Sequence, residues 1–283
     1  MPGRCAGHSA CDGVKELKMP AAIGDRCRGP AWILVLAVSI GLLWIDDARP
    51  ATGPAGRAQP PVAGADGGTP VGAGRQPLGC ASRPGSVVSG GASSGREVAL
   101  TFDDGPSLAH TPQILATLDR FGAHATFFEE GRHVHGREAL MRQILAAGDE
   151  IGNHSFSHPH DPGYRQLTRT DRYIHRATGF EPCLFRPPYG LLNSKVVAAA
   201  RQAGLQIVLW SLDSHDEHHP GAAAIASHVL AAARPGAIVL MHDGGHHPQT
   251  VRALPTILRG LRRSGFGFAT VSELLGERMR YGR

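Results

Sequence analysis

The sequence has few cysteines, and none of the spacings that give cysteine a clear role. Only five occur among its 283 residues, and no CxxC pair is present. Three of them precede a long apolar run, so outside a cell at most one disulfide could form, between Cys80 and Cys183. This pattern excludes a disulfide-rich scaffold, and we expect all five cysteines to be free thiols without a role.

Motifs for binding nucleic acid are also absent from the sequence. The formal net charge of +5 favours acidic surfaces such as anionic wall polymers, phospholipid head groups or nucleic acid. The basic residues do not gather into one stripe, and there is no helix-turn-helix, zinc-finger or RNA-binding signature. We therefore expect no nucleic-acid partner.

One hydrophobic run stands out, at residues 31–45, and it is short. About 20 apolar residues are needed to span the hydrocarbon of a bilayer. Arg26 and Arg28 precede the run and two aspartates follow it, so the chain downstream should be exported. Residues 1–47 therefore resemble a signal peptide, but no small-x-small cleavage site lies close behind the run. An uncleaved membrane anchor is the alternative.

Large apolar side chains are scarce between residues 48 and 95, where proline, glycine, alanine and serine dominate. Such a segment cannot bury enough surface to fold, so we expect a disordered linker. The composition changes at Arg96, and we expect a folded domain over residues 96–283.

Short apolar runs alternate with helical patterns after Arg96, and no internal repeat is visible. The expected strands are Glu97–Phe102, His124–Glu129, Glu150–His154, Cys183–Arg186, Gln206–Asp213, Ala237–His242 and Gly267–Val271. Alternation of this kind predicts an α/β fold with parallel strands and helical crossovers. We expect a distorted, incomplete (β/α) barrel of about seven parallel strands, with an open doubly wound sheet as the alternative.

Ionisable side chains stand at the carboxyl ends of five of these expected strands. They are Asp103 and Asp104, His154 with the nearby His158, Arg186, Asp213 with Asp216, and His242 with Asp243. Side chains at this end of a β/α barrel converge on one site. The sequence therefore predicts an active site at this rim.

The histidine pair and the aspartate pair together indicate a metal. His154 and His158 are four residues apart, a spacing that places two side chains on one side of a helical turn. Alone, this spacing more often marks surface or hydrogen-bonded core histidines. Two imidazoles and one carboxylate, however, are the ligands of a catalytic zinc with an open position. A dication would also relieve the repulsion between Asp103 and Asp104. We expect zinc, although cobalt, nickel or iron(II) would suit the same ligands.

Five motifs occur in the order and rough spacing of the polysaccharide deacetylase family, the carbohydrate esterases that act on chitin, peptidoglycan and xylan. They are T-F-D-D-G-P at 101–106, H-S-F-S-H at 154–158, R-P-P-Y-G at 186–190, D-S-H-D at 213–216 and L-M-H at 240–242. The resemblance covers roughly residues 96–275.

The resemblance implies roles for the residues that create and stabilise the reacting charge. Asp103 resembles the general base, and Asp104, His154 and His158 resemble the three metal ligands. Arg186 resembles the residue that fixes the base and keeps it ionised.

Further roles follow from the same resemblance. The backbone N–H of Tyr189 resembles an oxyanion donor, with Pro187 beside it on the substrate side, and Leu240 would line the slot for the acetyl methyl. His242 resembles the general acid, oriented by Asp216, with Asp213 as the second candidate for that task.

Two departures from the family pattern affect the expected groove. Glu217 stands where relatives usually carry tryptophan, so an aromatic wall should be missing. The stretch between His158 and Ala177 is short, which predicts a trimmed crossover helix.

The resemblance implies a metal-dependent N-deacetylase that is exported and acts on an acetylated cell-wall polysaccharide. Peptidoglycan is the favoured polymer, since we see no separate chitin-binding module. Chitin oligomers and O-acetyl xylan are the alternatives. A catalytically idle wall-binding protein and a hydrolase of small amides are the competing classes. We expect a monomer, attached to the membrane only if the N-terminal segment is uncleaved.

Overall fold

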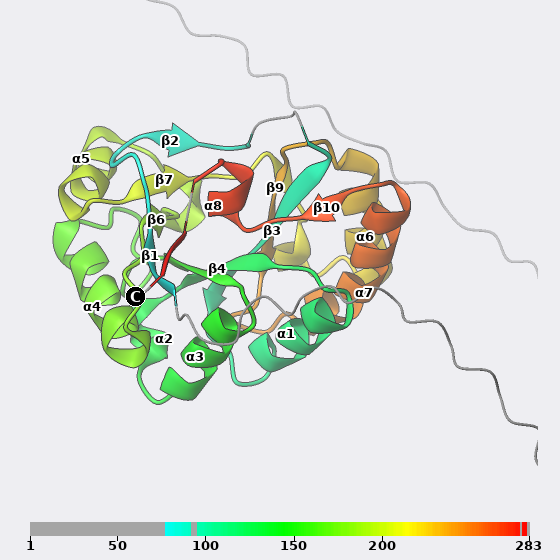
Figure 1. Ribbon diagram of the computed structural model, residues 1–283, viewed down its shortest axis with the longest axis horizontal. Coiled ribbons are helices and arrows are strands. Elements are labelled where there is room, and N and C mark those ends of the chain that lie inside the picture. Colours follow the sequence, from blue (N-terminus) through cyan, green and yellow to red (C-terminus); the bar gives the residue numbers. More distant parts are fainter. Residues whose placement is uncertain (1–76, 92–94, 278, 282–283) are drawn as a thin grey trace, which may run out of the picture. The chain divides into compact units, whose positions relative to one another are not determined.

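The computed structural model describes residues 77–91, 95–277 and 279–281 (Figure 1). The expected N-terminal region, residues 1–47, and most of the expected linker lie outside the described residues. No helix in the described part of the chain is long and apolar enough to cross a bilayer.

A curled sheet of nine strands forms the centre of the fold, in the order β2-β7-β6-β5-β4-β3-β9-β8, with β10 beside the start of β3. Each pairing within it is parallel. The strands are β2 (Val87–Val88), β3 (Glu97–Gly105), β4 (Ala125–Glu129), β5 (Glu150–Asn153), β6 (Leu184–Phe185), β7 (Gln206–Val208), β8 (Leu212–Asp213), β9 (Ile238–His242) and β10 (Gly267–Phe268). The expected α/β fold with an incomplete barrel is confirmed.

The sheet is nearly but not fully closed. Just after β2, Gly90 forms an isolated bridge with Ala237, which precedes β9. The backbone N–H of Gly91 also donates to the Gly236 carbonyl at 2.8 Å. The strand expected over Gln206–Asp213 is interrupted, because residues 209–211 leave the ladder between β7 and β8.

Helices cover the outside of the curl in Figure 1. They are α1 (Thr111–Arg120), α2 (Gly131–Val134), α3 (Glu138–Ala146), α4 (Tyr164–Thr178), α5 (Ser194–Ala203), α6 (Ala222–Ala232), α7 (Pro248–Arg263) and α8 (Val271–Leu274), with short 3-10 turns η1 (Pro188–Gly190) and η2 (Asp216–His218). Helix α4 has 15 residues, so the expectation of a trimmed crossover helix was wrong. Its start carries few apolar residues, which hid the helical pattern in the sequence.

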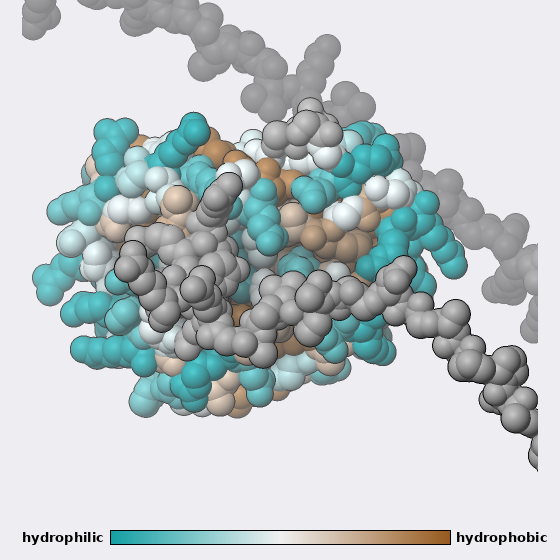
Figure 2. Space-filling view, viewed as in Figure 1, coloured by the Kyte–Doolittle hydropathy of each residue, from teal (hydrophilic) through white to brown (hydrophobic). Residues whose placement is uncertain are grey.

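The core lies between the sheet and these helices. Strands β3 and β4 are buried along nearly their whole length, as continuous apolar runs in parallel sheets usually are. Helix α7 buries Leu254, Ile257, Leu258 and Leu261, which recur at helical spacing. In Figure 2, hydrophilic side chains follow the outline of the domain, and hydrophobic ones appear mainly toward its centre.

The amino end of the barrel is covered by α8. The Val271 backbone N–H donates to Thr126 Oγ1 at 2.9 Å, and Ser272 Oγ donates to Glu150 at 2.5 Å. Thr126 and Glu150 lie at or near the amino ends of β4 and β5. With this end filled, the opposite end of the barrel is left for a site.

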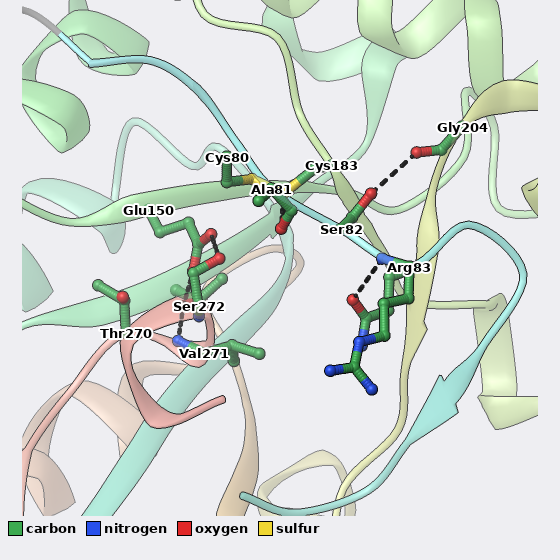
Figure 3. Close-up of a disulfide and its surroundings, with 12 residues drawn as sticks. Cys80, Ala81, Ser82, Arg83, Glu150, Cys183, Gly204, Thr270, Val271 and Ser272 are labelled. Carbon is green, nitrogen blue, oxygen red and sulfur yellow. Dashed lines mark hydrogen bonds between the residues drawn. A yellow bond between two sulfur atoms is a disulfide. The ribbon is translucent and has the colours of Figure 1, made fainter. Parts of the chain in front are cut away.

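Two expectations about residues before Arg96 were wrong. Cys80 and Cys183 form a disulfide with their Cα atoms 5.7 Å apart (Figure 3), so these two cysteines are not free thiols. Residues 77–91 are also not linker. Strand β1 (Pro77–Cys80) pairs antiparallel with β11 (Met279–Tyr281), and β2 extends the main sheet. Such short strands have too few residues to show a periodic pattern, and their partners are remote in sequence.

Candidate active site and metal centre

A pocket of about 420 Å³ opens at the carboxyl ends of the strands. It is lined by Asp103, Asp104, His154, His158, Pro187, Tyr189, Trp210, Asp213, Glu217, Leu240, His242 and His247. The two remaining predicted residues, Arg186 and Asp216, are buried and hydrogen-bond to Asp103 and His242 of this lining. The structure therefore brings all the predicted site residues together.

The two adjacent aspartates share this pocket because the strand ends irregularly. Neighbouring side chains of a regular strand point to opposite faces of a sheet. Asp104 instead has a left-handed backbone, with φ of 71°, and the register with β4 shifts between Asp103 and Gly105. This irregularity allows both carboxylates to face the same cavity.

Asp104, His154 and His158 form a compact donor group. Oδ1 of Asp104 lies 3.3 Å from His154 Nε2 and 3.4 Å from His158 Nε2. Ligands at about 2.0–2.2 Å from one tetrahedral ion are separated by about this distance. The same Oδ1 is buried and accepts no hydrogen bond within the described residues. These donors therefore fit a divalent metal ion.

The protonation of this group also suits a metal. His154 Nδ1 is 2.8 Å from the Arg186 carbonyl, so we assign the ring proton to Nδ1 and leave Nε2 free to bind. Burial raises the pKa of Asp104, but the imidazoles of His154, His242 and His158 outweigh it and hold that pKa well below its usual range. Asp104 is thus an ionised ligand.

The histidines do not lie on a helical turn, which corrects the expectation from their spacing. Residues 154–158 form a loop in which Ser155 and His158 have φ of 66° and 57°. The loop still brings the two imidazole centroids to 4.9 Å. The spacing therefore predicted the correct pair of histidines, but the backbone between them is a loop and not a helical turn.

Asp103 is held by a buried arginine. Its Oδ1 accepts a hydrogen bond of 2.7 Å from Arg186 Nη1. Arg186 is fully buried, donates also to Thr101 Oγ1 at 2.7 Å, and stacks on the Phe128 ring at 4.1 Å. Arg186 is therefore not an ordinary surface arginine, and it compensates the charge of Asp103 at a position shielded from solvent.

His242 is held on the other side of the site by Asp216. The ring Nδ1 is 2.7 Å from Asp216 Oδ1, and the other carboxylate oxygen accepts from the His242 backbone N–H at 2.9 Å and from Thr250 Oγ1 at 2.5 Å. Burial lowers the pKa of His242, but Asp216 outweighs it and raises the pKa to about 9. His242 therefore stays protonated near neutral pH.

Asp213 takes a different position from Asp216. It lines the pocket, but its Oδ1 accepts the His215 backbone N–H at 2.8 Å, and His242 bonds to Asp216 instead. Asp216 is therefore the residue that orients the imidazole, and Asp213 does not share that task.

The wall near Tyr189 is more aromatic than the sequence indicated. Tyr189 has φ of 59°, its ring is 57% exposed, and it packs edge-on against His158 at 4.5 Å. Trp210 also lines the pocket, close to Gly190. Glu217 lines the pocket, but Tyr189 and Trp210 line it too, so the expected loss of an aromatic wall is only partial. Trp210 ends an apolar run, V-L-W, that looks like core in the sequence.

Two buried carboxyl groups lie beneath the site, and neither of them was assigned a role from the sequence alone. A Cβ at Gly105 would lie 2.4 Å from Asp243 Oδ2 and 2.7 Å from Glu129 Oε2, so both carboxyls crowd this glycine. Burial, with the nearby acidic groups, raises the pKa of Asp243 to about 7 and that of Glu129 well above its usual value. Thr111 Oγ1 donates to Asp243. In the sequence, only their position at strand ends could have marked them.

The chain resembles known deacetylases. Residues 90–208 match the family model for polysaccharide deacetylase. The chain is 43% identical over 186 residues to a peptidoglycan-N-acetylglucosamine deacetylase of Bacillus cereus, covering 63% of this chain and 87% of the relative. It is 39% identical over 198 residues to peptidoglycan-N-acetylglucosamine deacetylase PgdA of Listeria monocytogenes, covering 68% of this chain but only 41% of that relative.

A solved structure is similar too. The Bc1960 peptidoglycan N-acetylglucosamine deacetylase, in complex with a hydroxamate-type ligand (4-naphthalen-1-yl-N-oxidanyl-benzamide), superposes with a TM-score of 0.66 at 32% identity. The match covers 70% of this chain and 95% of that one. The similarity therefore extends to the described fold as a whole.

Proposed function

Because the chain belongs to the polysaccharide deacetylase family, we propose that it hydrolyses the N-acetyl groups of N-acetylglucosamine units in a cell-wall polysaccharide and releases acetate. The observation that carries this proposal is the pairing of a base and an acid. Asp103, held by Arg186, and His242, held by Asp216, stand at the same register of adjacent strands. Both face the pocket that contains the Asp104, His154 and His158 donors.

The metal-ligand group fits zinc best, since it offers two nitrogens and one oxygen. A bound divalent ion would supply Lewis acidity for the acetyl carbonyl and would activate water at neutral pH. Cobalt, nickel or iron(II) would fit the same donors.

The chain's own residues would perform the proton transfers. Asp103 takes a proton from the attacking water, and the ion pair with Arg186 holds its carboxylate in place. The Tyr189 backbone N–H donates to the developing oxyanion. Protonated His242 then gives its proton to the leaving sugar amine, and Leu240, apolar and nearly buried, borders the space for the acetyl methyl.

Peptidoglycan is the polymer that the surroundings of the site favour. A second hollow adjoins the first, because Asp104 and His158 line both. It also presents Arg137, and Arg132 paired with Glu130 at 2.6 Å. Peptidoglycan carries carboxylates that arginines can bind, whereas chitin oligomers and acetylxylan carry none on their repeating sugars. The named relatives act on peptidoglycan N-acetylglucosamine.

The place of action follows from the N-terminal sequence. We infer an exported protein whose catalytic domain lies outside the cell, wall-associated or tethered to the membrane through residues 31–45 if this segment is uncleaved. We infer that it works as a monomer on its polymer.

Acetate release by the full chain tests this function. Peptidoglycan, N-acetylglucosamine oligomers and acetylxylan are assayed with zinc and with a chelator. We expect release from peptidoglycan that is lost with chelator and in Asp104→Asn, but kept in Asp119→Asn, which changes an exposed aspartate of α1. The chain should begin before Cys80, since a start at Arg96 would remove β2 and one half of the disulfide.

The two competing classes predict other results. A catalytically idle wall-binding protein would bind peptidoglycan and release no acetate with any metal, although the base, the acid and the three ligand residues are all in place. A hydrolase of small amides would act on short linear or cyclic amides and leave the polymer unchanged.

A further inference from the structure

A second group of metal-binding side chains lies at the edge of the pocket and has no part in the reaction above. It follows β8 and continues into η2. We call it the rim cluster, and its members are Asp213, His215, Glu217 and His218. Asp213 and Glu217 also line the catalytic pocket, so the cluster forms part of its wall.

The donor atoms of the rim cluster are spaced like those of the catalytic ligand group. His218 Nε2 lies 3.3 Å from Glu217 Oε1, and His215 Nδ1 lies 3.4 Å from Asp213 Oδ1 and 4.0 Å from Glu217 Oε1. The corresponding separations among Asp104, His154 and His158 are 3.3 and 3.4 Å. Such separations suit donors about 2.0–2.2 Å from a shared ion.

Charge and hydrogen bonding give a second reason to place a cation here. Three carboxylates, those of Asp213, Asp216 and Glu217, fall within five consecutive positions of the chain. Glu217 Oε2 is shielded from solvent and has no hydrogen-bond partner in the described part of the chain. Asp216 is committed to His242, whereas the described residues give Asp213 and Glu217 only the histidines of the rim cluster as nearby side-chain partners.

The surroundings offer one more imidazole. His228 of α6 has its ring centroid 4.9 Å from that of His215. Two or three imidazoles with two carboxylates are donors that zinc and similar transition metals prefer over calcium or magnesium, which take oxygen ligands.

We propose that the rim cluster binds a second divalent transition-metal ion of the zinc class, held by His215, His218 and Glu217 and supported by Asp213. The donor atoms of His215, His218 and Glu217 lie within 4.8 Å of one another, and Asp213 Oδ1 supports the His215 ring at 3.4 Å. The ion links His215 to Glu217 and His218 of η2. Since η2 begins with Asp216, the same ion steadies the residue that orients His242.

Zinc stoichiometry tests the rim site without relying on activity. The full chain, made without a histidine tag, is dialysed against dilute zinc and its bound metal is counted by mass spectrometry. We expect about two zinc ions in the wild type, about one in His215→Ala/His218→Ala, about one in Asp104→Asn, and none in the combined variant.

Matched controls separate a built site from loose binding to histidine. His135→Ala/His175→Ala removes two exposed histidines elsewhere and should keep about two ions. Glu217→Gln, which keeps the shape of the side chain, should lower the count like the double histidine variant. Circular dichroism confirms that each variant is folded.

Each result decides one proposal. A wild type with one ion, or a rim variant that still binds two, overturns the rim site. Wild-type protein that binds one ion and releases acetate refutes only the rim site, whereas protein that binds two ions and releases no acetate refutes only the proposed function.

Discussion

The two ends of the barrel both bury carboxyl groups, but they treat them in opposite ways. At the amino end, Glu150 accepts hydrogen bonds from Thr126 Oγ1 at 3.0 Å and from Ser272 N and Oγ at 3.1 and 2.5 Å. Asp149 accepts the Ala125 backbone N–H at 2.8 Å. At the carboxyl end, Oδ1 of Asp104 has no hydrogen-bond donor among the described residues.

The pKa values of Asp149 and Glu150 differ from that of Asp104 in the same way, although Asp243 and Glu129 beneath the site also have raised pKa values. Burial raises the pKa of Asp149 to about 8 and that of Glu150 to about 7, because their donors are neutral. At Asp104 burial acts in the same direction, but the neighbouring imidazoles outweigh it and lower the pKa. A buried carboxyl surrounded by neutral donors belongs to the fold, whereas one left ionised without donors is ready to hold a cation.

The largest expected effect is a fall in kcat in His242→Ala, which changes the carboxyl end of the barrel only. The variant loses the proton donor for the leaving amine, so we expect kcat to fall about 10²–10⁴-fold while zinc content stays the same. Ser272→Ala, at the amino end, is the control and should keep the wild-type kcat. Metal loss in His242→Ala would contradict the role of His242 as the acid. A similar loss of kcat in Ser272→Ala would contradict the claim that only the carboxyl end carries the chemistry.

Removing the disulfide should give the next largest effect, and on stability alone. Cys80 and Cys183 are 103 positions apart, so joining them restricts a long loop of the unfolded chain. We expect Cys80→Ala/Cys183→Ala to lower the free energy of unfolding by about 2–4 kcal/mol, measured with urea, at unchanged kcat.

The reduced wild type should behave like that double variant. A fall in kcat while the protein remains folded would show that the ends are coupled through β6, which runs from just after Cys183 to just before Arg186.

The sequence was sufficient to predict the parts of the molecule that have long or repeated patterns. The central strands β3, β4 and β9 are continuous apolar runs. The expected site residues lie near the carboxyl ends of β3, β5, β6, β8 and β9 or shortly after them. The site could be predicted from the sequence because parallel strands place their carboxyl ends together.

What the sequence could not show depends on short elements and remote partners. Strand β2 has two residues, and its pairing with β7 joins segments more than a hundred positions apart. The position of Trp210 depends on where β7 ends and the chain leaves the sheet. Glu129 looked like the polar end of a strand, although it is fully buried.

A smaller effect is expected from Asp216→Asn, on the pH dependence of kcat/KM. This variant tests whether His242 is the general acid. Protonated His242 is the active form, so activity is present below its pKa and is lost as pH rises through about 9. Without the carboxylate, burial dominates and the pKa falls, so the alkaline limb of kcat/KM should move to lower pH. Asp213→Asn is the control and should leave that limb in place. An unmoved limb in Asp216→Asn would assign it to another group.

The smallest expected effect, and one confined to the amino end, is that of Glu150→Gln on the pH dependence of stability. The pKa of Glu150 is raised by burial from 4.5 to about 7 in the folded protein. Its contribution to stability is therefore fully present below about pH 4.5 and is lost as pH rises through 7. The variant should flatten the fall of the unfolding free energy over this range, with unchanged acetate release. A residual slope should remain from the other buried carboxyls with raised pKa values, such as Asp149, Asp171 and Asp243. Urea unfolding at several pH values measures both slopes. Equal slopes would mean that Glu150 titrates alike in the folded and unfolded chain, and a loss of acetate release would mean that the amino end contributes to the chemistry.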